Sequence, residues 1–104
     1  AVATKGLDRD QIAAVIQKNS GQVRFCYEQG LQSDPQLNGR VAVDFVIGGN
    51  GFIKSAAVSN TTLNAKGIED CILMRLKTWK FPLPDGGVDV KVEYPFVLRR
   101  AGQG

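Results

Sequence analysis

Residues 63–82, LNAKGIEDCILMRLKTWKFP, and the stretch before them at residues 39–59, GRVAVDFVIGGNGFIKSAAVS, decide the fold of this chain. In the later stretch, apolar residues recur at the spacing of one helix face: Ile68, Cys71, Ile72, Leu76 and Trp79. The earlier stretch alternates apolar and polar residues, and the glycine-rich residues 48–51 supply the positive-φ positions of a tight turn. We therefore predict strand, turn, strand and helix, with Trp79-Lys80-Phe81-Pro82 leading into a last strand.

That last strand, residues 88–98, has the clearest two-residue period in the chain. Its apolar face is formed by Val88, Val90, Val92, Tyr94, Phe96 and Leu98. The opposite face carries Asp89, Lys91, Glu93 and Pro95. A proline inside a strand is found at a sheet edge or a bulge, because it has no N–H for the ladder. We therefore expect this strand to lie at the edge of the sheet.

A helix is predicted before these strands. Asp8 and Gln11 have the spacing of a capping box, which indicates that the helix starts at this point. It should end near residues 30–32, before Asp34-Pro35. Ser20-Gly21 lowers the helix propensity in the middle and predicts a slight bend.

The order helix, strand, strand, helix, strand predicts an α+β two-layer sandwich with one three-stranded antiparallel or mixed sheet. The last strand should lie beside the first and parallel to the second, in the order 2-1-3, with two helices covering one face. Phe45, Trp79 and Phe81 are the expected core anchors. We expect a disordered lead-in at residues 1–6, the domain at residues 7–98 and a flexible tail at residues 99–104.

Composition narrows the function classes. The 104 residues suffice for one domain with a single core, and no apolar run approaches the roughly 20 residues that span a bilayer. The net charge of +3 selects no partner, and the chain has no nucleic-acid recognition motif. The sequence contains no pair of carboxylates at a spacing that would indicate an enzyme. There is no initiator Met or signal peptide, so we expect a piece excised from a longer protein.

Cys26 and Cys71 are the two cysteines, and the chain contains no histidine. They cannot form an ordinary four-ligand zinc site, and a Cys–His nucleophile pair is impossible within this chain. From the residues alone, a disulfide and two buried thiols remain open. The role of Phe25 is also open, because it falls opposite the apolar face of the first helix and is either a scattered surface aromatic or a partner contact.

Across residues 38–98, this layout with its WKFP exit resembles the TonB C-terminal domain. Two further segments, VRFCYE at residues 23–28 and DCI at residues 70–72, together with a Cys eight residues before Trp79, narrow the resemblance. Taken together they resemble the AgmX/PglI C-terminal domain, a TonB-like family of gliding-motility proteins. Arg75 departs from the small residue expected at its position.

The resemblance implies a periplasmic domain of an inner-membrane-anchored protein. Such a domain binds an outer-membrane or periplasmic partner by strand addition, and it transmits force from an inner-membrane motor complex reached through the parent chain. The implied binding edge is formed by Val88, Asp89, Val90, Lys91, Val92, Glu93, Tyr94, Pro95 and Phe96.

The resemblance also bears on the cysteines. Because its members work in an oxidising compartment, and Cys26 and Cys71 both lie on apolar helix faces, it implies a disulfide between them. No cofactor, metal, nucleic acid or small-molecule substrate is expected. The alternative function is a passive periplasmic module that binds a scaffold protein or a cell-wall polymer.

Overall fold

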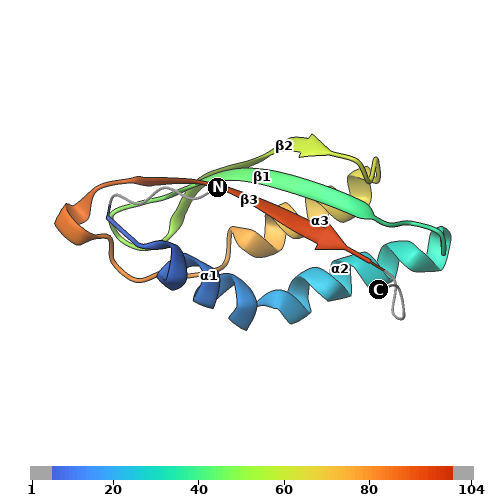
Figure 1. Cartoon of the computed structure of the whole chain (residues 1–104), viewed down its shortest axis with the longest axis horizontal. Helices are drawn as coiled ribbons and strands as arrows, with labels where there is room; N and C mark the ends of the chain where they lie inside the picture. Colours follow the sequence, from blue (N-terminus) through green and yellow to red (C-terminus); the bar gives the residue numbers. More distant parts are fainter. Residues whose placement is uncertain (1–5, 100–104) are drawn as a thin grey trace.

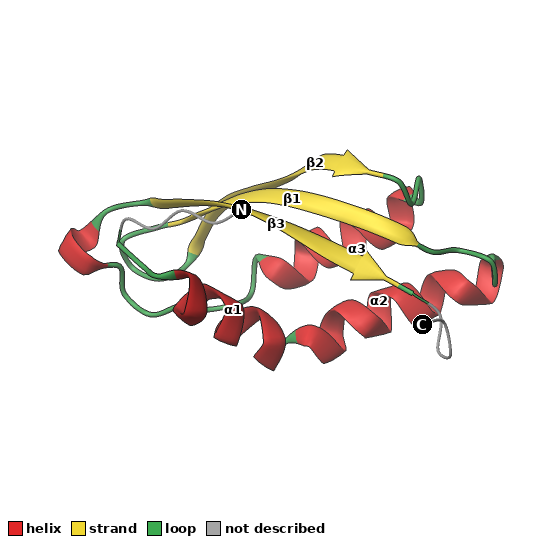
Figure 2. Ribbon diagram, in the orientation of Figure 1, coloured by secondary structure: helices red, strands yellow, loops and turns green. Residues whose placement is uncertain are grey.

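The computed structural model describes residues 6–99 and has two layers, a sheet on one side and helices on the other (Figures 1 and 2). Its elements are α1 (Arg9–Lys18), α2 (Ser20–Ser33), β1 (Gly39–Ile47), β2 (Ile53–Thr61), α3 (Lys66–Leu76), the short 3₁₀ helix η1 (Asp85–Gly87) and β3 (Val90–Leu98). The predicted α+β class is confirmed. The predicted lead-in and tail lie outside the described residues except for Gly6 and Arg99, so those two boundaries remain predictions.

The sheet has the predicted order β2-β1-β3, and both neighbouring pairs are antiparallel. β1 and β3 pair without interruption from Gly39 opposite Leu98 to Ile47 opposite Val90. The central strand β1 buries its inward side chains almost completely, among them Phe45. Since β1 is flanked on both sides, the two open edges of the sheet are β2 and β3.

The helix predicted over the first third of the chain is two helices. α1 begins as expected, because the Asp8 carboxylate accepts from the Gln11 amide at 2.8 Å and the Gln11 side chain accepts from the Asp8 amide at 3.0 Å. The helical path breaks at Asn19, whose side-chain amide donates to the Val15 carbonyl at 2.8 Å. The Asn19 side chain thus competes with backbone N–H groups for a helix carbonyl, and Ser20-Gly21 has low helix propensity. The structure therefore has a break between two helices where we predicted a slight bend.

Two predicted boundaries also differ. β3 starts at Val90 instead of Val88, because the ladder with β1 begins where Val90 lies opposite Ile47, the last residue of β1. Val88 is already extended, but it lies before this pairing, just after the turn in which Gly86 and Gly87 adopt positive φ. α3 ends at Leu76, so Trp79 follows the helix instead of closing its apolar stripe.

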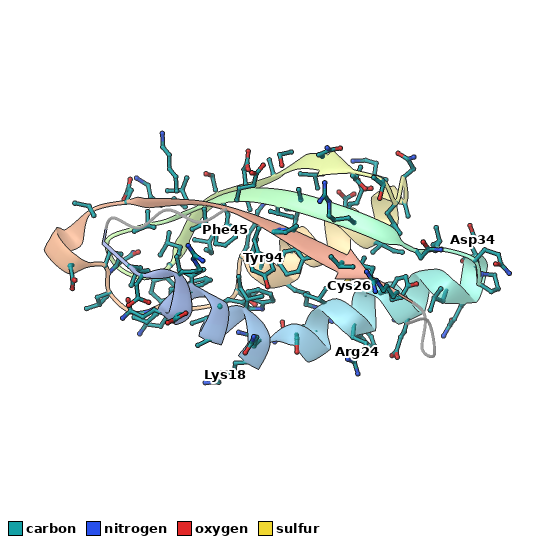
Figure 3. All side chains as sticks on the ribbon, in the orientation of Figure 1. Lys18, Arg24, Cys26, Asp34, Phe45 and Tyr94 are labelled. Atoms are coloured by element: carbon teal, nitrogen blue, oxygen red, sulfur yellow. A yellow bond between two sulfur atoms is a disulfide. The ribbon has the colours of Figure 1, made fainter. Side chains whose placement is uncertain are left out.

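The core fills the space between the two layers. Phe45, Trp79 and Phe81 are each 2% exposed, and the Phe45 and Phe81 rings lie 5.9 Å apart. Tyr94 points from β3 into the same space (Figure 3). α3 packs against β2 and α2, which leaves α1 and α2 as the helices on the β3 side.

Candidate protein-binding edge

The hydrogen bonds of β1 determine which residues of β3 direct their peptide groups toward the outer edge of the sheet. Arg40 directs its peptide groups at β2: its carbonyl accepts from the Thr62 amide and its amide donates to Thr62 Oγ1, both at 2.9 Å. Peptide groups alternate along a strand, so the odd-numbered residues of β1 face β3. Through the unbroken register, the residues of β3 that face β1 are Val90, Val92, Tyr94, Phe96 and Leu98. The residues between them direct their peptide groups away from the sheet: Lys91, Glu93, Pro95 and Val97.

This outward set is suited to accepting another strand. Lys91, Glu93 and Val97 each present one N–H and one C=O, whereas Pro95 presents a carbonyl alone. Within residues 6–99 no further strand lies beside this edge of the sheet. Pro95 removes no hydrogen bond from the β1–β3 ladder, because its missing N–H would have pointed outward. The outer edge therefore offers an added strand a regular row of N–H and C=O groups in which one donor, that of Pro95, is missing.

The other edge of the sheet is irregular. In the pairing of β1 with β2, Ala42 lies opposite Asn60 but Val43 lies opposite Val58, which leaves Ser59 as an extra residue in β2. A second shift near the start of β2 leaves Lys54 as another extra residue. Such bulges twist a strand and interrupt the spacing of its outward groups, which discourages edge-to-edge pairing. Of the two edges, β3 is the regular one.

A groove of about 670 Å³ runs between the C-terminal half of β3 and the helices α1 and α2. Its apolar lining includes Ile16, Val23, Tyr27, Leu31, Tyr94 and Phe96. Arg24 and Glu28, both exposed on α2, add charge to it. A strand added to β3 would point every second side chain toward this apolar groove.

A disulfide joins two of the helices, α2 and α3. Cys26 of α2 and Cys71 of α3 are bonded, with their Cα atoms 5.8 Å apart. The helices are also in close contact at Gly30, where an added Cβ would lie only 2.1 Å from Cδ1 of Ile68. Because α2 forms one wall of the groove, the disulfide fixes that wall relative to the rest of the helix layer.

Charges at the start of β3 are arranged differently from those further along it. Asp89 forms an ion pair with Lys54 of β2, with Nζ and Oδ2 2.8 Å apart. The hydrogen bond from Lys54 lowers the pKa of Asp89 below its ordinary value. Asp89 is therefore engaged with β2, and it precedes the strand in which sequence reasoning placed it. Val88 likewise precedes β3.

Sequence reasoning assigned no role to several residues around this edge. It ended the binding edge at Phe96 and so left out Val97, although the predicted strand continued to Leu98. It did not identify the groove wall at Val23 and Tyr27, because helical spacing marks these only as apolar. Phe25 and Arg75 lie together on the helix surface, with the guanidinium 5.3 Å from the ring centroid. They belong to different helices, so no local pattern pairs them.

Other kinds of site are not indicated in the described part of the chain. Among residues 6–99, no group of three or more His, Cys, Asp or Glu side chains is placed to hold a metal ion. No helix within that range is both long and apolar enough to cross a membrane.

The chain is similar in structure to the solution NMR structure of the TonB C-terminal domain of Pseudomonas aeruginosa. The TM-score is 0.59 at 21% sequence identity, over 73% of this chain and 78% of that one. At this identity the likeness shows the fold. No protein-family model matches the chain, and no curated protein matches it significantly.

Proposed function

We propose that this chain is a periplasmic protein-binding domain that captures an extended segment of its partner as a fourth strand on β3. The observation that carries the proposal is the regular outward edge at Lys91, Glu93 and Val97, beside an apolar groove. The bulges of β2 support the choice of edge, since they leave β3 as the regular one. The TonB-like fold supports the class of function.

Binding of this kind needs no deep pocket and no reactive side chain. The partner gains backbone hydrogen bonds at the outward residues, each contributing about 0.5–1.5 kcal/mol net. Its alternate side chains pack in the groove against Val23 and Tyr27 of α2 and add apolar burial. We propose a binding domain and no enzyme, with a protein segment of the outer membrane or the periplasm as its partner.

The finer proposal concerns the parent chain. We infer a protein anchored in the inner membrane and related to the AgmX/PglI gliding-motility proteins, which passes force from a motor complex to the bound partner. A domain under load must keep its binding edge intact, and the Cys26–Cys71 disulfide ties two of its helices together for that task. A passive module would bind in the same way without coupling to a motor. The transmembrane and linker regions of the parent chain distinguish the two.

The proposal is tested by an NMR titration of the ¹⁵N-labelled domain with extended segments of candidate outer-membrane and periplasmic proteins. We expect the amide shifts to concentrate on Lys91, Glu93 and Val97, with smaller shifts along α2 beside the groove. Hydrogen exchange at the same three amides should slow on binding. Shifts confined to Phe25 and Arg75 on the helix surface would place the binding site elsewhere and reject strand addition.

A further inference from the structure

The residues that direct their peptide groups outward from β3 are also those whose side chains lie on the exposed face of the sheet. They are Lys91, Glu93, Pro95 and Val97, all exposed. In a sheet, residues directly opposite each other on adjacent strands place their side chains on the same face with about 4.5–5.5 Å between Cβ atoms. Each of these four side chains would therefore have a direct neighbour in an added strand.

On the inner side, neither charge at this edge has an oppositely charged residue directly opposite it in β1. Lys91 lies opposite the apolar Val46 of β1. Glu93 lies opposite Asp44, which is a like charge, and such pairs are unfavourable when directly opposed. Neither Lys91, Glu93 nor Asp44 takes part in an ion pair within residues 6–99.

The Glu93 carboxylate does accept a hydrogen bond from Ser59 of β2, at 3.3 Å. A neutral hydroxyl offsets little of the repulsion between two carboxylates. The side still open to a cation is the outer edge, where an added strand would lie. Lys91 is likewise open to an anionic side chain at the outer edge.

Further along the edge, the charged character ends. Val97 is a 55% exposed apolar side chain, and the groove beside this half of β3 is mainly apolar. The edge is thus divided at Pro95 into a charged half and an apolar half. An occupant that matches both halves must change character along its length.

We propose that the preferred partner segment carries an acidic residue opposite Lys91 and, two positions away, a basic residue opposite Glu93. Opposite Pro95 it carries a residue other than proline, whose N–H can donate to the Pro95 carbonyl. Opposite Val97 it carries a β-branched apolar residue, and the residues between these four are apolar where they face the groove. This inference rests on the strand addition proposed above, and it names the sequence pattern that the edge selects.

The test is a charge-swap cycle with synthetic peptides of about eight residues, the length of an ordinary strand. One peptide carries Glu opposite Lys91 and Lys opposite Glu93, and its counterpart has the two exchanged. Both are made in the two chain directions, so the result does not depend on strand polarity. The protein variant is K91E/E93K, which retains the net charge of +3 because the two charges only change places.

We expect the unmodified protein to bind the first peptide on the order of tenfold more tightly at low ionic strength, with the preference reversed in K91E/E93K. The preference should shrink as salt is added, since both pairs are exposed. K91Q/E93Q also retains the net charge and should bind both peptides equally, which supplies the control if the swapped variant fails to fold. Folding is checked from the dispersed amide spectrum of each variant.

The outcomes separate the two proposals. If the peptides shift the Lys91, Glu93 and Val97 amides but bind equally well, or if the swap leaves the preference unchanged, the charge pattern is rejected and strand addition stands. If no peptide in either direction shifts these amides, strand addition itself is rejected and the charge pattern with it. Reversal of the preference with loss of discrimination in K91Q/E93Q supports the inference.

Discussion

The indole Nε1 of Trp79 donates a 3.0 Å hydrogen bond to Oε1 of Gln22 in α2. Trp79 also makes an edge contact with Phe96 of β3, with ring centroids 6.4 Å apart. One side chain therefore contacts both walls of the groove, the helix on one side and the edge strand on the other. Its loss should affect stability and the shape of the groove together.

Trp79→Ala should lower the free energy of unfolding by about 3–5 kcal/mol, because it removes a large buried side chain and leaves a cavity. Urea unfolding followed by far-ultraviolet circular dichroism measures the change. Gln22→Ala serves as the partial control, since it leaves the buried indole N–H without this acceptor and should cost about 1–3 kcal/mol. A Trp79→Ala midpoint close to that of the unmodified protein would show that Trp79 is not a core anchor.

Lys91→Pro should weaken partner binding strongly while the fold survives. The Lys91 amide points away from β1, so proline removes a donor from the open edge and none from the β1–β3 ladder. Lys91→Ala is the matched control: it removes the charge but retains the amide, and should reduce affinity only a few-fold. Peptide titration of both variants measures the difference. Equal affinities would indicate that the backbone of Lys91 does not contribute to binding.

Reduction of the Cys26–Cys71 disulfide should destabilise the domain by about 4 kcal/mol on the loop-entropy estimate, since the bridge closes a loop with a sequence separation of 45. Denaturant unfolding with and without reductant measures this. Mass spectrometry of the unreduced, alkylated protein should show both thiols protected. The variant C26A/C71A should be less stable than the unmodified protein when no reductant is present, and adding reductant should not change its stability. Free alkylation of both cysteines in folded, oxidised protein contradicts the disulfide.

The Asp89–Lys54 ion pair predicts a small pH dependence of stability. The hydrogen bond from Lys54 lowers the pKa of Asp89 in the folded protein below the value of 3.8 that it has without such a partner. The stabilisation is therefore fully present above about pH 3.8 and is lost as the pH falls through the lower folded-state pKa. The thermal midpoints of the unmodified protein and Asp89→Asn should differ at neutral pH and converge in acid. A difference that persists unchanged in acid would contradict this assignment.

Features that depend on neighbouring residues along the chain were predictable from the sequence. The Asp8–Gln11 capping box formed as its spacing indicated, because each side chain bonds the backbone of the other residue, three positions away in the chain. The alternation from Val90 to Leu98 predicted which face of β3 is buried, since side chains alternate in any strand. Pro95 indicated an edge strand from its missing N–H alone. The strand order followed from short connections and the handedness of crossovers.

Features that depend on register and on contacts between elements required the tertiary structure. Which residues of β3 direct their peptide groups outward follows from the pairing with β1, and a shift of one residue would reverse the set. Three further features involve segments that are distant in sequence: the opposition of Asp44 and Glu93, the bulges at Ser59 and Lys54, and the groove beside α2. Local periodicity places a side chain on a face of its own element. The neighbour across the interface is set by packing, which no local pattern contains.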